Sequence, residues 1–151
     1  MPNTDREWSL EEIRARFAIE DLYDRQLEAA EAHDWGLYDT TFAPEARIDL
    51  SDFGEPVRGY VDYRSWLAAL ARDMPRALRL TGGLRLRLDG ERATTRVPVL
   101  CYVKMRGAEG EAWSTTALFY NDELRRTEEG WRIVTRYEER VFPDDSDPGR
   151  A

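Results

Sequence analysis

The spacing of apolar residues in this chain changes from a helical period to a strand period at about residue 80. Between residues 13 and 30 the apolar side chains recur every three or four positions, as on one side of an α-helix. After residue 83 they alternate with polar side chains, as in strands with one buried face. Helices followed by a meander of long antiparallel strands predict the α+β class, with the helices packed on one face of the sheet.

Local signals set the expected boundaries of these elements. Ser9 and Glu12 form a capping box, which predicts a first helix from about Leu10. Asp34 caps a second, short helix that we expect to include residues 35–42 and to end at Pro44. A short strand follows at residues 46–50, and a third helix spans residues 60–74. The strands then occupy 84–88, 97–103, 112–126 and 131–142, with a hairpin turn at residues 89–90.

Length and charge exclude several classes of protein. The 151 residues suit one domain, which we place at 9–142, between a flexible N-terminus (1–8) and a disordered tail (143–151). A net charge of −8 disfavours nucleic acid, and no apolar run is long enough to span a membrane. With one cysteine, Cys101, and one histidine, His33, neither an internal disulfide nor a His/Cys metal site is expected. The N-terminus does not read as a signal peptide, so the sequence favours the cytoplasm.

Four stretches resemble a known family when they are taken in order. They are AIEDLYDRQLEA, HDWGLYDTTFAPEARIDL, VRGY and YNDELRRTEEGWRI. Together they resemble the SnoaL-like branch of the nuclear-transport-factor-2-like (NTF2-like) superfamily, in particular scytalone dehydratase, bile-acid 7α-dehydratase and hexachlorocyclohexane dehydrochlorinase. The resemblance implies a cone-shaped fold in which three N-terminal helices pack on a curved antiparallel sheet around a deep apolar pocket. It also implies elimination without a cofactor, by an Asp–His pair, and a trimer in several members.

The residues of the family's site are only partly present here. Glu31 stands where the family has its Asp, and Arg79 stands where it has its His. Arg136 matches the family's Arg on the last strand, although the alternation alone leaves open which face of that strand it occupies. Gln26 replaces a Lys of the dehydrochlorinase, and Leu50 replaces a Tyr of scytalone dehydratase.

Glu31 is the residue on which the catalytic hypothesis depends. An acid in the last turn of a helix opposes the helix dipole, and burial on the apolar side would raise its pKa. Such a cost is typical of a functional site, but the alternative is that Glu31 points into solvent. Arg79 stays protonated, so it would pair with Glu31 or stabilise an oxyanion. It shares a sheet face with Leu84 only if a bulge lies at Gly82-Gly83; otherwise Arg79 is exposed.

We therefore expect an enzyme without metal or organic cofactor that acts on a small hydrophobic ring compound by dehydratase-like elimination. Isomerisation or cyclisation through the same enolate is one alternative, and a non-catalytic ligand-binding or subunit module, in which Glu31 and Arg79 form a buried salt bridge, is another. The expected partners are a small hydrophobic molecule and further copies of the chain, in a homodimer or homotrimer through the outer sheet face. The assigned catalytic residues are Glu31, Arg79, Arg136 and Tyr23, where Tyr23 could equally be a core residue, and the substrate-binding residues are Gln26, Leu27, Trp35, Leu50 and Tyr120.

Overall fold

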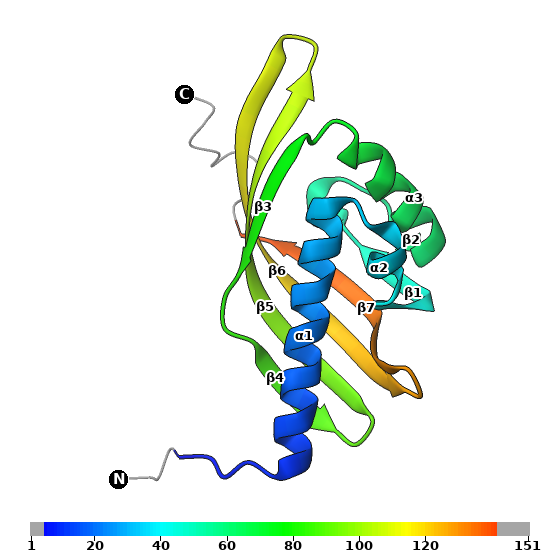
Figure 1. Ribbon diagram of the computed structural model, residues 1–151, viewed down its shortest axis with the longest axis vertical. Coiled ribbons are helices and arrows are strands. Elements are labelled where there is room, and N and C mark those ends of the chain that lie inside the picture. The colour runs from blue at the N-terminus through cyan, green and yellow to red at the C-terminus, as the bar shows by residue number, and fades with distance from the viewer. Residues whose placement is uncertain (1–4, 142–151) are drawn as a thin grey trace.

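The computed structural model describes residues 5–141, which form three α-helices, a short 3₁₀ helix and a seven-stranded sheet (Figure 1). The α+β class predicted from the sequence is confirmed. The expected disordered tail lies outside the described residues. In chain order the elements are α1 (Leu10–Ala32), α2 (Trp35–Asp39), β1 (Phe42–Asp49), η1 (Ser51–Phe53), β2 (Arg58–Gly59), α3 (Tyr60–Ala71), β3 (Arg76–Thr81), β4 (Arg85–Asp89), β5 (Arg92–Gly107), β6 (Gly110–Thr127) and β7 (Gly130–Arg140).

Helix α1 begins at the predicted capping box. The Ser9 hydroxyl accepts a hydrogen bond from the Glu12 amide at 3.1 Å, and the Glu12 carboxylate accepts one from the Ser9 amide at 2.9 Å. The helix ends at His33, which adopts a left-handed conformation with φ of 56°. The second helix is shorter than expected, because Phe42 is the first residue of β1 and Pro44 lies inside that strand, at a register irregularity.

The sheet has the order β2-β1-β7-β6-β5-β3, and β4 also pairs with β5. All pairs are antiparallel except β1 with β7, so the sheet is mixed and the prediction of a purely antiparallel sheet is wrong. The reason is that β1 docks on the last strand of the meander, which runs in the same direction. Alternation of side chains along a strand carries no information about the direction of its neighbour.

A bulge joins β3 to β4, which is one of the two alternatives that the sequence left open for Arg79. Between the pairs Thr81–Val99 and Arg85–Arg96, the chain advances four residues on the β3–β4 side and three on β5. The extra residue brings Arg79 to the same side of the sheet as the leucines of β4. Gly82 is required at this point because a Cβ atom there would lie 2.6 Å from the ring of Pro98.

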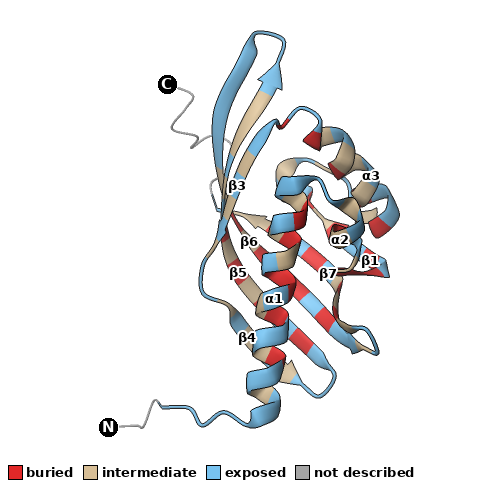
Figure 2. Cartoon of the chain, in the orientation of Figure 1, coloured by how far each residue is buried: buried red, intermediate tan, exposed pale blue. Residues whose placement is uncertain are grey.

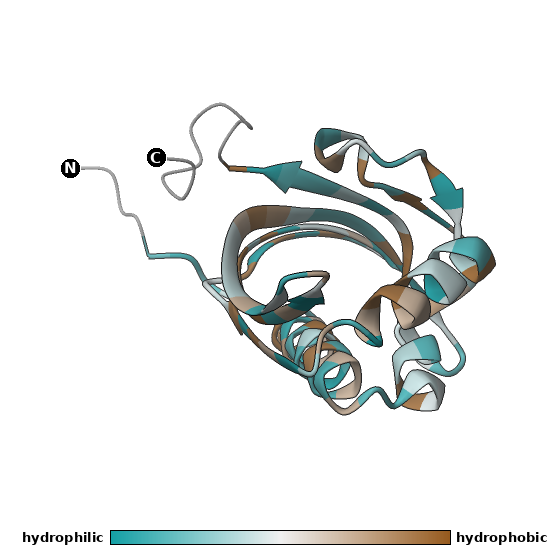
Figure 3. Cartoon of the chain, turned by 90° about the horizontal axis from the view of Figure 1, so that it is seen from above, coloured by the Kyte–Doolittle hydropathy of each residue, from teal (hydrophilic) through white to brown (hydrophobic). Residues whose placement is uncertain are grey.

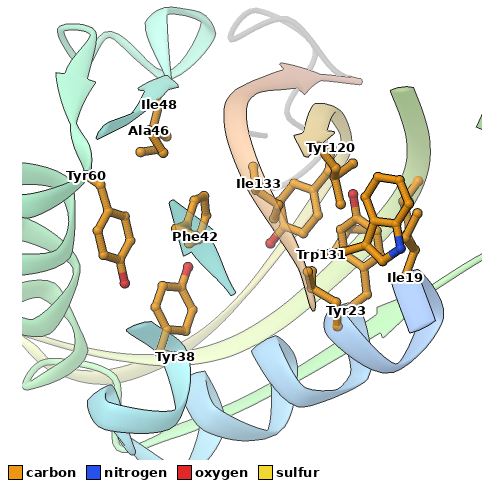
Figure 4. Packing of buried hydrophobic residues seen from close by; sticks show 14 of the residues in the cluster. Ile19, Tyr23, Tyr38, Phe42, Ala46, Ile48, Tyr60, Tyr120, Trp131 and Ile133 are labelled. Carbon is orange, nitrogen blue, oxygen red and sulfur yellow. The ribbon is translucent and has the colours of Figure 1, made fainter. Parts of the chain in front are cut away.

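The helices cover the concave face of the sheet, and the core lies between the two layers. Seen from above, the sheet curls strongly and the helices close its open side (Figure 3), and the buried residues concentrate where α1 crosses the strands (Figure 2). Aromatic rings fill much of this layer: Phe42 stacks on Tyr60 at 4.8 Å between centroids, and Tyr23 on Tyr120 at 6.5 Å (Figure 4). Ile13 and Phe17, which belong to the expected apolar side of α1, are exposed, whereas Ala15 between them is buried, so the first turns of the helix present another side to the core.

Candidate functional site

A cavity of about 390 Å³ lies between the concave face of the sheet and the helices. Its volume is in the range of sites for small molecules. Most of its wall is apolar, which favours a hydrophobic ligand. The apolar lining consists of Leu27, Ala30, Leu50, Phe53, Trp66, Leu67, Leu70, Met74, Val103, Met105 and Leu118. The polar lining consists of Gln26, Tyr38, Glu55, Tyr63, Arg79, Cys101, Ser114, Thr116, Tyr120 and Glu138.

Glu138 brings a carboxyl group into this cavity from β7. Its exposed fraction is 8%, and no hydrogen bond to its side chain is formed within residues 5–141. Burial raises the pKa of Glu138 to about 7; the charge of Arg136 lowers this pKa, Asp122 raises it and Arg79 lowers it. A carboxyl group with a pKa near neutrality can both accept and return a proton under physiological conditions.

Arg79 enters the cavity from the edge strand β3, where it pairs with Cys101 of β5. Its Nη1 atom is buried and has no hydrogen-bond partner among the described residues. Burial disfavours the charged form, but the neighbouring Tyr120 and Cys101 favour it, and the pKa of Arg79 is raised. The cavity therefore contains a permanent cation with an unused donor, which suits a carbonyl or oxyanion.

Three tyrosines complete the polar part of the cavity. The hydroxyls of Tyr38 and Tyr63 lie 3.3 Å apart. Tyr120 is paired with Glu138 across β6 and β7, and its hydroxyl has no hydrogen-bond partner within the described part of the chain. Burial raises the pKa of all three phenols above the ordinary value. They stay protonated at neutral pH and act as hydrogen-bond donors.

Behind the cavity, Arg136 is the centre of a buried polar network. Its guanidinium donates to both oxygens of Asp122, at 2.9 and 2.7 Å, and to the side-chain oxygen of Gln26 at 2.8 Å. The ring of Tyr120 lies 3.7 Å from the guanidinium carbon. The hydroxyl of Tyr23 donates to Asp122 at 2.6 Å. Each of the three guanidinium nitrogens of Arg136 thus donates to a protein oxygen.

The structure brings together some of the predicted site residues and separates others. Arg79 lines the cavity, as do the predicted binding residues Gln26, Leu27, Leu50 and Tyr120. Arg136 and Tyr23 do not line it, since both belong to the network behind it. Trp35 also lies outside it, where it stacks on His33 with 5.8 Å between the rings.

The expected position of Glu31 inside the pocket is wrong. Glu31 is exposed, and its Oε1 atom accepts a hydrogen bond from the main-chain amide of Arg79 at 3.1 Å. The buried salt bridge with the Arg79 side chain, on which the binding-module alternative depended, is absent from the described residues. Ala29 is on the buried side of α1, and a residue two positions further along a helix points elsewhere. The hydrogen bond of Glu31 therefore links the end of α1 to β3 on the outside of the cavity.

Comparison with known proteins agrees with this architecture. The SnoaL-like domain family matches residues 11–137. The chain belongs to this family. An uncharacterized protein of Mycobacterium tuberculosis is 30% identical over 135 residues, which cover 89% of this chain and 90% of the other.

Several solved structures of other proteins share the fold. The protein Kfla4162 from Kribbella flavida has a TM-score of 0.79 and 21% identity over 86% of this chain and 93% of its own. A hexachlorocyclohexane dehydrochlorinase, LinA type 2, has a TM-score of 0.77 and 20% identity over 88% of this chain and 89% of its own. No helix in residues 5–141 is long and apolar enough to cross a membrane.

Sequence reasoning missed Glu138 in this SnoaL-like domain, although a signal was present. Glu138 is two residues after Arg136, so both side chains belong on the same face of β7. Once Arg136 had been assigned to the concave face, Glu138 should have followed. Tyr38 and Tyr63 were visible only as apolar positions of the two short helices, because their meeting depends on tertiary packing.

Proposed function

We propose that this SnoaL-like domain is a cofactor-independent lyase-type enzyme in which Glu138 is the general base. The observation that carries the proposal is the buried carboxyl of Glu138, which has a pKa of about 7 and no hydrogen-bond partner within residues 5–141. A structural carboxyl would normally be paired at this depth, since an unpaired buried charge is costly. The base thus comes from the last strand instead of the first helix.

The proposed reaction is elimination of water from a hydrophobic ring compound that bears a carbonyl group and a β-hydroxyl. Glu138 takes the proton from the carbon next to the carbonyl, and the C–H electron pair forms an enolate. The unpartnered donor of Arg79 and the hydroxyl of Tyr120 stabilise the enolate oxygen. The enolate then expels the β-hydroxyl, which leaves as water with the proton held by Glu138, so that the enzyme returns to its starting state.

Two features support elimination. The cavity combines a base near neutral pKa with a cation and phenolic donors in an apolar wall, which is what enolate formation requires. Two proteins of the same fold, a hexachlorocyclohexane dehydrochlorinase and a protein from Novosphingobium aromaticivorans described as a scytalone dehydratase, are named for eliminations. Isomerisation through the same enolate is the second candidate, because a carboxyl group with a pKa of about 7 can return its proton to another carbon.

The proposal is tested with 3-hydroxycyclohexanones that carry alkyl substituents, by the ultraviolet absorbance of the enone product. Glu138→Gln should lower the rate by about 10²–10⁴-fold and leave binding intact. Glu31→Gln is the matched control, since it removes an exposed carboxylate outside the cavity. Equal rates for the wild type and Glu138→Gln would refute the assignment. Exchange of the ring protons with deuterium, without enone formation, would favour isomerisation.

A further inference from the structure

The strand pairing arranges the side chains on the inner surface of the cavity in successive rows across the sheet. Tyr120 pairs with Val97 of β5, and Arg79 pairs with Cys101, four residues further along the same strand. Four residues correspond to ~13 Å along a strand. Arg79 also lines the cavity, and its charge acts on the pKa of Glu138 across this distance.

The cavity continues beyond the Arg79 row in the other direction. Val103 pairs with Ser114, and Met105 lies two residues further along β5. This point is ~26 Å along the strand from the residue that pairs with Tyr120. The facing wall is apolar and comes from α3 and the loop after it, with the residues Leu67, Leu70 and Met74.

Exposure rises along this path. Tyr120 and Glu138 are 7% and 8% exposed. Val103 and Met105 are partly exposed, and Ser114 is exposed. The cavity therefore opens at the end near Ser114, beside the projecting β5–β6 hairpin (Figure 1), and Glu138 and Tyr120 lie at the closed end, with the Arg79 row between.

We propose that the cavity takes its substrate lengthwise, with a neutral, oxygen-bearing head at Glu138 and Tyr120 and an unbranched hydrocarbon tail running past Val103 to the opening. The identity of the head group rests on the proposed function. The presence of a tail is inferred only from the rows of side chains that line the cavity. The substrate class is then a cyclic ketone with a linear apolar chain, rather than a compact ring system.

The side chains that line the half of the cavity nearest the opening determine whether the tail is charged or apolar. The only ionisable group of this half among the described lining residues is Glu55, which is held by Arg58 at 2.7 Å. The polar groups of β6 in this half are the hydroxyls of Ser114 and Thr116. A charged tail would lose its hydration there without gaining a counter-charge. A hydrocarbon tail gains from burial, by about fourfold in affinity for each methylene.

The test uses 4-alkylcyclohexanones from methyl to octyl, with dissociation constants measured by isothermal titration calorimetry. For the wild type, affinity should rise by about fourfold per methylene over the shorter members and level off once the chain reaches the opening. Val103→Trp fills the tail region and should flatten this dependence on chain length. Tyr102→Trp is the matched control, because Tyr102 is the adjacent residue on the outer face, and should leave the dependence unchanged.

An affinity independent of chain length in the wild type would overturn the inference, as would an unchanged dependence in Val103→Trp. If Val103→Trp does not fold, as judged by its melting curve, Ser114→Phe at the rim replaces it with the same two outcomes. Turnover of the alkyl-substituted 3-hydroxycyclohexanones by the wild type separates this inference from the proposed function. A retained chain-length dependence together with no turnover by the wild type would leave the lengthwise site in place and refute the lyase assignment.

Discussion

Tyr120 and Glu138 face each other as cross-strand partners on β6 and β7, and both side chains reach the same cavity. The ring of Tyr120 also rests on the guanidinium of Arg136 at 3.7 Å, so a fully buried ion pair supports it from behind. Functional groups that stand on paired strands are held more precisely than groups on loops. The donor and the base therefore keep a fixed relation to each other before any ligand arrives.

The rate of the proposed reaction should depend on the ionisation of Glu138. A general base works in its deprotonated form, and the pKa of Glu138 is about 7. We expect kcat/KM to rise tenfold per pH unit below pH 7 and to level off above it. Rates measured from pH 5 to pH 9 check this. A profile that is already flat at pH 5 would contradict the role of Glu138.

The Arg79→Met variant tests how the charge of Arg79 affects the same pH profile of kcat/KM. The positive charge of Arg79 lowers the pKa of Glu138, so its removal should move the midpoint of the profile to higher pH. The plateau rate should also fall, by about 10²–10³-fold, if Arg79 stabilises an oxyanion. Arg76→Met, at an exposed position of the same strand, is the control for the loss of one charge.

Ionisation of Glu138 should make the free energy of unfolding depend on pH. The unfolded chain releases this proton near pH 4.5, whereas the folded chain holds it up to about pH 7. The folded state therefore binds more protons between these values, and the free energy of unfolding falls as the pH rises, by roughly 3 kcal/mol at most. Urea unfolding of the wild type and Glu138→Gln at pH 5 and pH 8 isolates this contribution, since the variant should lack it.

Asp122→Asn should destabilise the protein far more than a surface change does. It leaves the buried charge of Arg136 without its counter-charge, which costs about 3–5 kcal/mol. Arg125→Gln breaks the exposed pair with Glu45 and should cost about 1 kcal/mol or less. Urea midpoints for the two variants compare these values. A loss of activity in Asp122→Asn without loss of stability would instead indicate a direct role in the reaction.

The outer face of the sheet carries an apolar patch that we expect to pair with a second copy of the chain. Leu78 and Tyr102 are directly paired on β3 and β5, and both are exposed, as are Leu80, Leu100 and Trp113 on the same face. Contiguous exposed apolar side chains typically mark an interface. Light scattering should give a mass that is a multiple of 17.6 kDa for the wild type. Tyr102→Lys should shift it to the monomer; a monomeric wild type would refute the expectation.

The sequence predicted the elements of this fold well because their signals are local. The capping box at Ser9 located the start of α1, and Gly82-Gly83 indicated where a bulge could lie, although the sequence left open whether Arg79 faces the cavity. Each of these rests on neighbouring residues alone. The parallel pairing of β1 with β7 was missed because it joins strands from opposite ends of the chain.

The site was harder to predict because it depends on the direction of single side chains. At the end of α1, a difference of one position turns a side chain by about 100°, which is why Glu31 could be placed on either side of the helix. Glu138 follows Arg136 by two residues, so alternation places both on one face of β7, but which face lines the cavity depends on the register of β5, β6 and β7. The resemblance to the family also directed attention to the first helix, whereas in this chain the acid in the cavity is on the last strand.

The ion pair between Asp122 and Arg136 has a consequence for how this lineage can diverge. Substitution of only one of the two residues by a neutral one would leave the charge of the other buried and unpaired. Descendants of this sequence should therefore keep both or exchange both together for neutral residues of similar volume. Glu31 is exposed and accepts one hydrogen bond from a main-chain amide, so it can be substituted without a matching change in another side chain.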